Sequence, residues 1–143
     1  MHDITAPTVV RDAVARAIAV VGLAGVALIH LLDTPGTSAD APYKGWLYIA
    51  LIAGCVCTAG ALIRRSDPLA WSAEAMLSSG AIVAFVLSRT VGLPQGADDI
   101  RNWTEPLGMA SLFVEGSLVA LSAAALGSLS GFSQRRALVS AHG

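Results

Sequence analysis

Charged side chains are scarce in this sequence. Only 13% of the 143 residues are charged, whereas 55% are hydrophobic and the mean hydropathy is +0.66. Soluble domains carry about 25% charged residues, so this composition excludes an ordinary soluble domain and a disordered chain. The formal net charge of −1 also leaves no basic surplus for nucleic acid.

Cysteine is nearly absent, and the two residues present do not form a chemical motif. Cys55 and Cys57 are two positions apart, which on a helix turns their side chains about 200° from each other. They cannot clamp one ion or pair with each other, and the C-x-x-C of the four-helix quinone-linked thiol oxidoreductases is missing. We expect them to be small apolar filler, with Cys55 the one that faces inward. A phosphate loop, a nucleophile elbow and paired haem histidines are also missing, so no cofactor is predicted.

What the sequence has instead is four long apolar stretches, at residues 13–32, 45–63, 69–87 and 107–129. Each is about 19 to 23 residues long, which at ~1.5 Å per residue matches the hydrocarbon core of a bilayer. The prediction is therefore an all-α, four-helix transmembrane bundle of antiparallel up-down topology, forming a single integral membrane domain over residues 1–143. Its outer loops are expected at 33–44 and 88–106.

The basic residues predict the orientation of this bundle, because cytoplasmic segments hold the excess of lysine and arginine. Three segments on one side of a four-span chain contain Arg11, Arg16, Arg64, Arg65, Arg135 and Arg136. The other side has Lys44, Arg89 and Arg101, outnumbered by Asp33, Asp40, Asp98, Asp99 and Glu105. Both termini are thus predicted to be cytoplasmic, in a multi-pass protein of the cytoplasmic (inner) membrane. The lipid bilayer is its first expected partner.

An alternative makes the first apolar stretch a cleaved signal peptide, with Thr37-Ser38-Ala39 as the small-residue cleavage site. The stretch is long for a signal core, and it ends in His30 and Asp33 rather than in small residues.

Local signals predict where some helices begin and end. Pro35 and Gly36 are expected to end the first helix. Asp67 is expected to cap the third helix, with Pro68 at its first position. Trp46, Trp71 and Trp103 are expected to anchor the bundle at the membrane interfaces.

Glu115 is the strongest candidate for a functional residue, because an ionisable group inside a span is costly unless it faces protein or water. It lies about 12 Å from the start of its apolar stretch. Helical spacing places it on a face with Gly108, Ser111 and Ser122, a small and polar stripe suited to close helix contact. We expect it to point inward, either as a functional carboxylate or as a protonated acid that fixes packing.

The third apolar stretch has a matching stripe that includes Glu74, Ser78 and Arg89. Glu74 lies about 8 Å from the cytoplasmic side, where it could be structural, pair with Arg65 or Arg16, or take part in function. Arg89 lies at the outer end, where it either snorkels to water or pairs with Glu115 or the Asp98-Asp99 pair.

His30 lies near the outer end of the first stretch and shares a face with Leu23 and Val26. Histidine changes charge near neutral pH and is a common metal ligand. Three interpretations stay open: an interfacial histidine, a proton- or ligand-binding group, and a metal ligand together with Glu115 and Asp33 or Asp99. Metal dependence is not decided by the sequence.

Several sequence elements lie around the two predicted outer loops. They are HLLDTPG at 30–36, LSRTVGLP at 87–94, Asp98-Asp99, WTEPLG at 103–108, Ser111, and Val114-Glu115. Together they resemble small four-span integral membrane proteins of high-GC bacteria, a group without an assigned activity. The resemblance implies a bacterial membrane protein whose outer half is a unit, and it implies no mechanism.

These observations favour a protein with an outward-facing polar pocket that binds a small ion, proton or polar ligand and could also translocate it. The expected ligand- or proton-binding residues are His30, Asp33, Glu74, Arg89, Asp98, Asp99, Glu105 and Glu115. In this hypothesis Arg89 is the counter-charge that keeps Glu115 ionised. The alternative is a non-catalytic accessory subunit of a larger membrane complex or a homo-oligomer. A membrane enzyme that uses His30 and a carboxylate is a third, less favoured, hypothesis.

Overall fold

The chain folds into long α-helices. The computed structural model describes the backbone of residues 6–141 and the side chains of residues 8–131. The elements in chain order are α1 (Ala6–Asp40), α2 (Pro42–Arg64), α3 (Pro68–Thr90), the short 3-10 helix η1 (Ala97–Asp99) and α4 (Pro106–Ala141). In these residues the all-α prediction is confirmed, and all four α-helices are long and apolar enough to cross a membrane.

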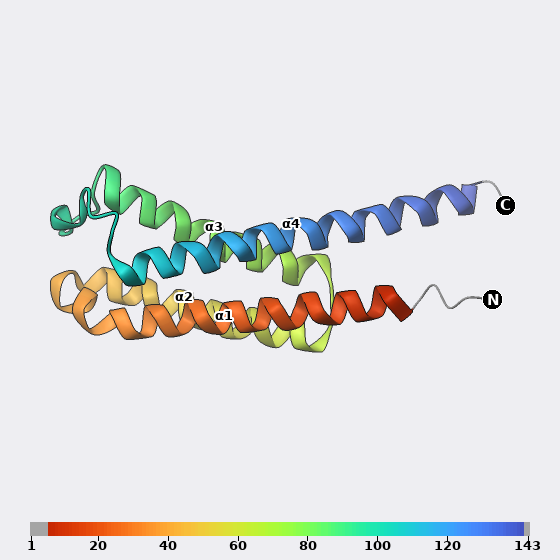
Figure 1. The fold of residues 1–143 in the computed structure, drawn as a ribbon, viewed down its shortest axis with the longest axis horizontal. Coiled ribbons are helices and arrows are strands. Elements are labelled where there is room, and N and C mark those ends of the chain that lie inside the picture. Colours follow the sequence, from red (N-terminus) through yellow and green to blue (C-terminus); the bar gives the residue numbers. More distant parts are fainter. Residues whose placement is uncertain (1–5, 142–143) are drawn as a thin grey trace.

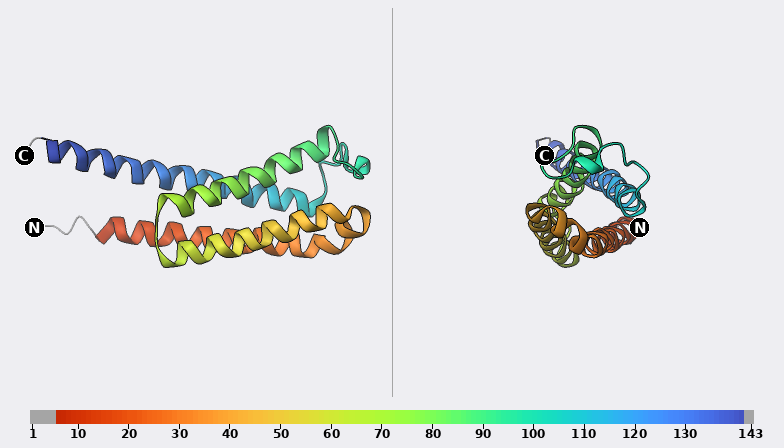
Figure 2. Two further views of the ribbon diagram at one scale, coloured as in Figure 1. Left: turned by 180° about the vertical axis from the view of Figure 1, so that it is seen from behind. Right: turned by 90° about the vertical axis from the view of Figure 1, so that its left-hand side faces the viewer.

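The four α-helices form a bundle in which each packs against two others (Figure 1). Helix α1 packs most extensively against α2, and α3 against α4; α1 with α4 and α2 with α3 complete a ring, which is visible end-on in Figure 2. Consecutive helices run in opposite directions. The α1–α2 turn and residues 91–105 lie at one end of the bundle, called here the turn end; the start of α1 and the end of α4 lie at the other, called the terminal end.

The expected outer loop at 33–44 is helical in the structure, except for Ala41. Pro35 lies inside α1 and does not end it, although it removes one backbone donor. The hydroxyl of Thr34 donates a hydrogen bond of 2.6 Å to the carbonyl of His30, as Ser and Thr side chains do near proline in membrane helices. Ser38 packs against Gly45 at the start of α2, so contact between the two helices supports the last turns of α1.

Asp67 and Pro68 play the parts that the sequence predicts. The Asp67 carboxylate accepts a 2.8 Å hydrogen bond from the backbone amide of Ala70, and Pro68 is the first residue of α3. Trp71 differs from the prediction of an interfacial anchor, because it is 1% exposed and its indole donates to the Ser66 hydroxyl at 3.0 Å. Trp46, by contrast, is 71% exposed on the bundle surface, as an anchor would be.

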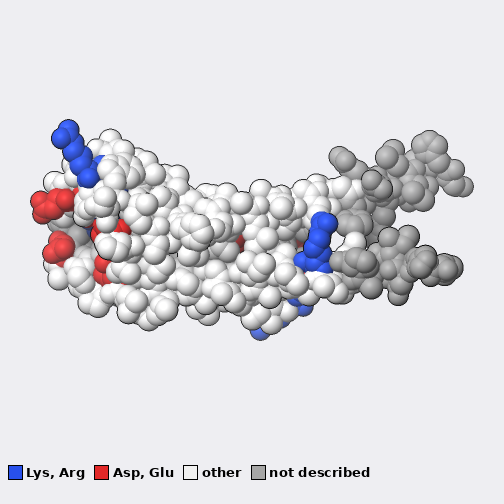
Figure 3. Space-filling view, viewed as in Figure 1, with Lys and Arg blue, Asp and Glu red and all other residues white. Residues whose placement is uncertain are grey.

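The bundle is apolar outside and partly polar inside. Large apolar side chains such as Val21, Leu69 and Phe113 are more than 70% exposed, while Glu74 and Glu115 are at most 1% exposed. Charged side chains gather toward the two ends of the molecule and leave a broad, nearly uncharged band between them (Figure 3). This inside-out distribution is the one that a helical bundle adopts in lipid, where the surface must be apolar.

Glycine permits a close approach between α1 and α4. A β-carbon at Gly22 would lie 2.7 Å from Cδ2 and 3.1 Å from Cγ of Leu118, whereas one at Gly25 would meet only Val114, at 3.9 Å. Leu118 is itself 2% exposed, so its whole side chain would have to move within a packed interface.

We therefore expect Gly22→Ala to lower the free energy of unfolding by about 1 to 3 kcal/mol through overpacking. Gly25→Ala is the matched control on the same helix and should change it little. Thermal unfolding of both variants in detergent tests this, and equal stability of the two variants would contradict the α1–α4 contact.

Candidate functional site

Glu115 lies in the interior of the bundle, as helical spacing predicts. It is 1% exposed, and the Ser111 hydroxyl one turn earlier donates a 2.6 Å hydrogen bond to its Oε1. Ser111, Glu115, Leu118 and Ser122 are all buried and follow one face of α4. Since α4 begins at Pro106, the carboxyl lies about 14 Å along the helix from the turn end.

Glu74 is the second buried carboxyl group. It is fully buried, and the Ser78 hydroxyl donates a 3.0 Å hydrogen bond to its Oε1. Its Oε2 has no hydrogen-bond partner among the described residues, and neither has the buried hydroxyl of Ser122. Unpartnered buried polar atoms are rare in folded proteins and mark places where a ligand or water belongs.

Neither arginine proposed as a partner for Glu74 pairs with it. Arg65 forms an ion pair of 2.7 Å with Asp67, and Arg16 forms one of 3.0 Å with Asp12. Each arginine pairs instead with an aspartate close to it in sequence.

The two buried carboxyls both lie within electrostatic range of one residue of α2. Cys55 is 1% exposed and lies within electrostatic range of both Glu74 and Glu115, so α2, α3 and α4 all contribute polar groups to one interior region. The prediction that Cys55 faces inward is confirmed, and Cys57 is exposed. Thr58, one turn along, adds a buried hydroxyl on the same helix.

His30 approaches this region from α1. Its Nδ1 lies 2.9 Å from the carbonyl oxygen of Val26, and its ring meets the Tyr48 ring edge to face at 4.8 Å. A carbonyl oxygen can only accept a hydrogen bond, so Nδ1 carries the proton and Nε2 is the nitrogen left for exchange. His30 also lies within electrostatic range of Glu115.

Asp33 does not join Glu115. Its Oδ2 accepts hydrogen bonds from the Tyr48 hydroxyl at 3.0 Å and from Thr37 at 3.2 Å, which ties the end of α1 to the start of α2. Sequence analysis missed Tyr48 as a site residue. Its only signal was its place two turns before Cys55, on the same face of the helix.

Arg89 is the centre of a separate group at the turn end. Its Nη1 forms a 2.8 Å ion pair with Asp99, and its Nη2 lies 3.6 Å from Glu105. Lys44 pairs with the other oxygen of Asp99 at 3.1 Å. We call Lys44, Arg89, Asp99 and Glu105 the ion-pair cluster. Two cations and two anions balance within it, and the Arg89 side chain is only 8% exposed.

This cluster corrects one expectation. Arg89 pairs with Asp99, which was one of its two predicted partners, and also with Glu105; it does not pair with Glu115, which it was expected to keep ionised. The guanidinium also lies 4.8 Å from the centre of the Phe85 ring, which fixes it at the end of α3. Among the described side chains, no arginine forms an ion pair with Glu115.

The ion-pair cluster fastens the α3–α4 loop to the helices. Glu105 also caps α4, because its carboxylate accepts hydrogen bonds from the backbone amides of Leu107 at 2.9 Å and Gly108 at 2.6 Å. The Tyr43 hydroxyl donates to the carbonyl of Pro94 at 2.7 Å, a second tie from α2 to this loop. Asp98, also an expected site residue, is exposed.

The expected site residues thus divide into two places. Glu115, Glu74 and His30 belong to the interior, whereas Arg89, Asp99 and Glu105 belong to the cap at the turn end. Among the residues that the structure describes, no three histidine, cysteine, aspartate or glutamate side chains form a group that could hold a metal ion. Lys44 was missed as a cluster member because its partner is 55 positions away in sequence.

Comparison with known protein families, with characterised proteins and with solved structures finds no match to this chain. The functional argument therefore depends on the residues themselves.

The ion-pair cluster predicts a response to acid. Partial burial acts to raise the pKa of Asp99, but hydrogen bonds and attraction from Lys44 and Arg89 outweigh it and hold the pKa below its ordinary value of 3.8. Because the pKa of Asp99 is lower in the folded protein than in the unfolded chain, the ionised Asp99 stabilises the fold. This stabilisation is complete above pH 3.8 and is lost as the pH falls through the lowered pKa of the folded protein.

We expect backbone amides of residues 91–105 to keep constant protection from hydrogen exchange, corrected for intrinsic rates, from neutral pH down to about pH 4, and to lose it below. In Asp99→Asn the protection should be low at every pH, because the anion is missing throughout. A wild-type loop whose protection does not change in acid would contradict this role of Asp99.

Proposed function

We propose that this chain is a multi-pass membrane protein that binds a proton or a small cation at the buried carboxyl of Glu115, and that Glu74 is a second site nearer the terminal end of the bundle. The observation that carries the proposal is that both carboxyl groups are buried and form no ion pair with a described lysine or arginine. Each accepts a hydrogen bond from a serine, and no lysine or arginine among the described side chains forms an ion pair with either.

The physical reason is the cost of an isolated charge. An ionised carboxylate in a medium of low dielectric constant is destabilised strongly unless it is paired, and in practice the group takes up a proton or binds a cation. The proton or the cation that neutralises the carboxyl is the ligand that we propose. Glu115 and Glu74 would then exchange that ligand whenever water reaches them.

The interior offers a route for such exchange. His30, whose Nε2 is available, lies nearer the turn end than Glu115, and Asp33 and Tyr48 lie beside it. Ser111 and Ser78 supply hydroxyls that can both donate and accept a hydrogen bond next to the two carboxyls. Movement from Glu115 through Ser78 to Glu74 would carry a proton or cation roughly 10 Å along the bundle, toward the terminal end, and translocation is the second part of the proposal.

The distribution of charge supports an orientation for the bundle. Arg11, Arg16, Arg64 and Arg65 lie toward the terminal end, while acidic residues predominate at the turn end. Because cytoplasmic segments hold the excess of lysine and arginine, we propose that both termini lie in the cytoplasm and the ion-pair cluster outside. Arg135 and Arg136, which belong to the same prediction, have side chains outside the described residues. The resemblance to four-span bacterial membrane proteins agrees with a location in the cytoplasmic membrane.

We expect Glu115→Gln to abolish proton or cation uptake by proteoliposomes, because glutamine keeps the shape and hydrogen-bonding ability of the side chain but cannot be charged. Asp98→Asn, which changes an exposed carboxylate in the loop, is the matched control and should keep full uptake. Glu74→Gln should slow uptake, because it interrupts the inner half of the route. Circular dichroism checks that the helices persist in each variant, and full uptake by a folded Glu115→Gln variant would contradict the proposal.

A second candidate function is that of a non-catalytic accessory subunit, and one surface feature favours it. A groove of about 400 Å³ runs between α1 and α4, bounded by Ile18, Gly22, Phe113, Ser117 and Leu121, among others. Small residues such as Gly22 and Ser117 allow a helix of another membrane protein to approach closely, and the 77% exposure of Phe113 provides an apolar contact.

For this alternative we expect a stoichiometric partner to co-purify from native membranes in mild detergent, and to be lost in Ser117→Phe, which blocks the groove. Ala120→Phe, on an exposed position of the same helix, is the control that should keep the partner. Purification of the chain alone, with uptake activity in liposomes, would reject the accessory role in favour of the first proposal.

A further inference from the structure

A second groove, between α1 and α2 near the terminal end, has a composition that differs from the rest of the surface. Its volume is about 380 Å³, and its lining residues are apolar except for Arg16. They are Ala13, Arg16, Ala17, Val20, Val21, Leu62 and Ile63. The groove exists because Ala13 and Ala17, one turn apart on α1, have side chains of a single methyl group beside the larger residues of α2.

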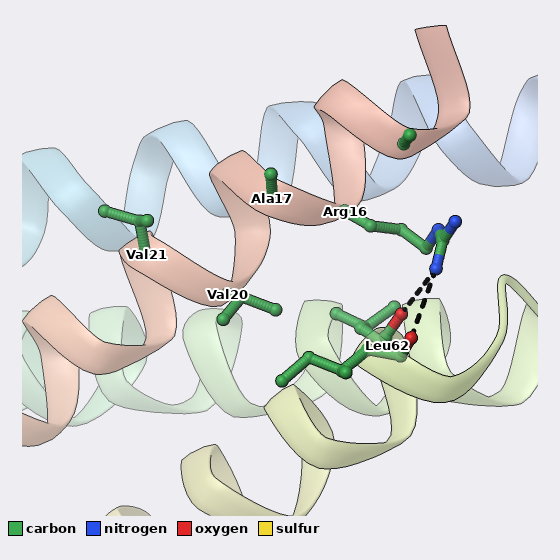
Figure 4. Close-up of a pocket in the computed structure, with 7 residues that line it drawn as sticks. Arg16, Ala17, Val20, Val21 and Leu62 are labelled. Carbon is green, nitrogen blue, oxygen red and sulfur yellow. Dashed lines mark hydrogen bonds between the residues drawn. The ribbon is translucent and has the colours of Figure 1, made fainter. Parts of the chain in front are cut away.

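Arg16 lies at one end of this groove, over the end of α2 (Figure 4). Its Nη1 donates hydrogen bonds to the carbonyls of Leu62 at 3.1 Å and Ile63 at 3.4 Å, and its Nε donates to Asp12 at 3.0 Å. The cation thus satisfies carbonyls that the last turn of a helix leaves without donors, and it opposes the negative end of the helix dipole. Its Nη2 takes part in none of these bonds.

The charges around this end favour an anion. Four arginines, Arg11, Arg16, Arg64 and Arg65, lie on α1 and at the end of α2, against the two aspartates Asp12 and Asp67. Arg64 is exposed and directly follows Ile63, a lining residue. An anionic group at the end of the groove would therefore meet a net positive charge, and guanidinium groups are well suited to phosphate.

We infer that this groove binds one anionic phospholipid, with an acyl chain along Ala13, Ala17, Val20 and Val21 and the phosphate beside Arg16 and Arg64. A bilayer supplies such a molecule next to the apolar walls, and its headgroup lies at the depth where cationic side chains at helix ends meet the interface. By contacting both α1 and the end of α2, the lipid would hold these two helices together. The inference is independent of proton or cation binding at Glu115.

Native mass spectrometry of the full chain in detergent tests this, with phosphatidylglycerol and phosphatidylcholine of identical acyl chains as the two probes. We expect one phosphatidylglycerol to stay bound about five-fold more tightly than phosphatidylcholine, the preference that one basic residue near the headgroup contributes. Arg16→Gln should remove that preference, whereas Arg16→Lys and Arg101→Gln, the latter outside the groove, should keep it. Glycerol phosphate, which has the charged headgroup but no acyl chain, should not compete.

Ala17→Leu gives an independent test, because it fills the groove at an exposed apolar position where folding should be unaffected. Retention of phosphatidylglycerol should fall in this variant and persist in Ala24→Leu, a matched change at another exposed position on α1. Equal retention of the two lipids, unchanged by Arg16→Gln, would overturn the inference. So would a dimer of this chain that forms without bound lipid and is lost in Ala17→Leu, because a second copy would then be the occupant.

Discussion

A carboxyl group in a surrounding of low dielectric constant must be neutral, paired or bound to a cation, and the arrangement of this bundle depends on that constraint. Glu74 and Glu115 are buried on facing helices, where each accepts one hydrogen bond from a serine four positions away on its own helix. The buried core holds large apolar side chains such as Leu23, Leu62 and Trp71, and Ser78, Ser111 and Ser122 are buried with them. Helices α3 and α4, which pack against each other, thus each carry a buried acid that forms no ion pair with a described lysine or arginine. These two carboxyls are the basis of the binding region that we propose in the interior.

The described lysine and arginine side chains that form ion pairs do so with carboxylates other than Glu74 and Glu115. Arg89 and Lys44 hold Asp99 at the turn end, so the α3–α4 loop is fastened over the bundle by charges that balance each other. At the terminal end, Arg16 is engaged with the last carbonyls of α2. Each cation thus stabilises an end of the bundle, where water or lipid headgroups can solvate it. The charged pairs thus lie at the ends of the bundle, and the carboxyls of Glu74 and Glu115 lie between them without an ion pair to a described cation. The proposed proton or small cation site requires this separation.

Much of the fold follows from local sequence signals, and the site follows from them only in part. The four apolar stretches, the cap at Asp67 and the inward direction of Glu115 can each be predicted locally. They depend on the length of an apolar run, on the residue type at a helix start and on helical spacing, all of which can be read along the sequence. Pro35 misled the prediction, because contacts with α2 keep α1 helical beyond it. The sequence left two partners open for Arg89, the Asp98-Asp99 pair and Glu115. Only the path of the loop between α3 and α4 decides that Asp99 is the one within contact distance. Lys44 and its partner are on different segments, so their contact has no signature in the sequence.

The central claim is that Glu115 carries an exchangeable proton or cation within the bundle. Infrared difference spectroscopy of the reconstituted protein between neutral and alkaline pH tests it most directly, because a protonated carboxyl has a carbonyl stretch that an ionised one lacks. Our account predicts such a band in the wild-type protein, shifted when the solvent is D2O, lost at alkaline pH and absent from Glu115→Gln. A spectrum identical in the wild type and Glu115→Gln would contradict the account, since Glu115 would then not titrate inside the bundle.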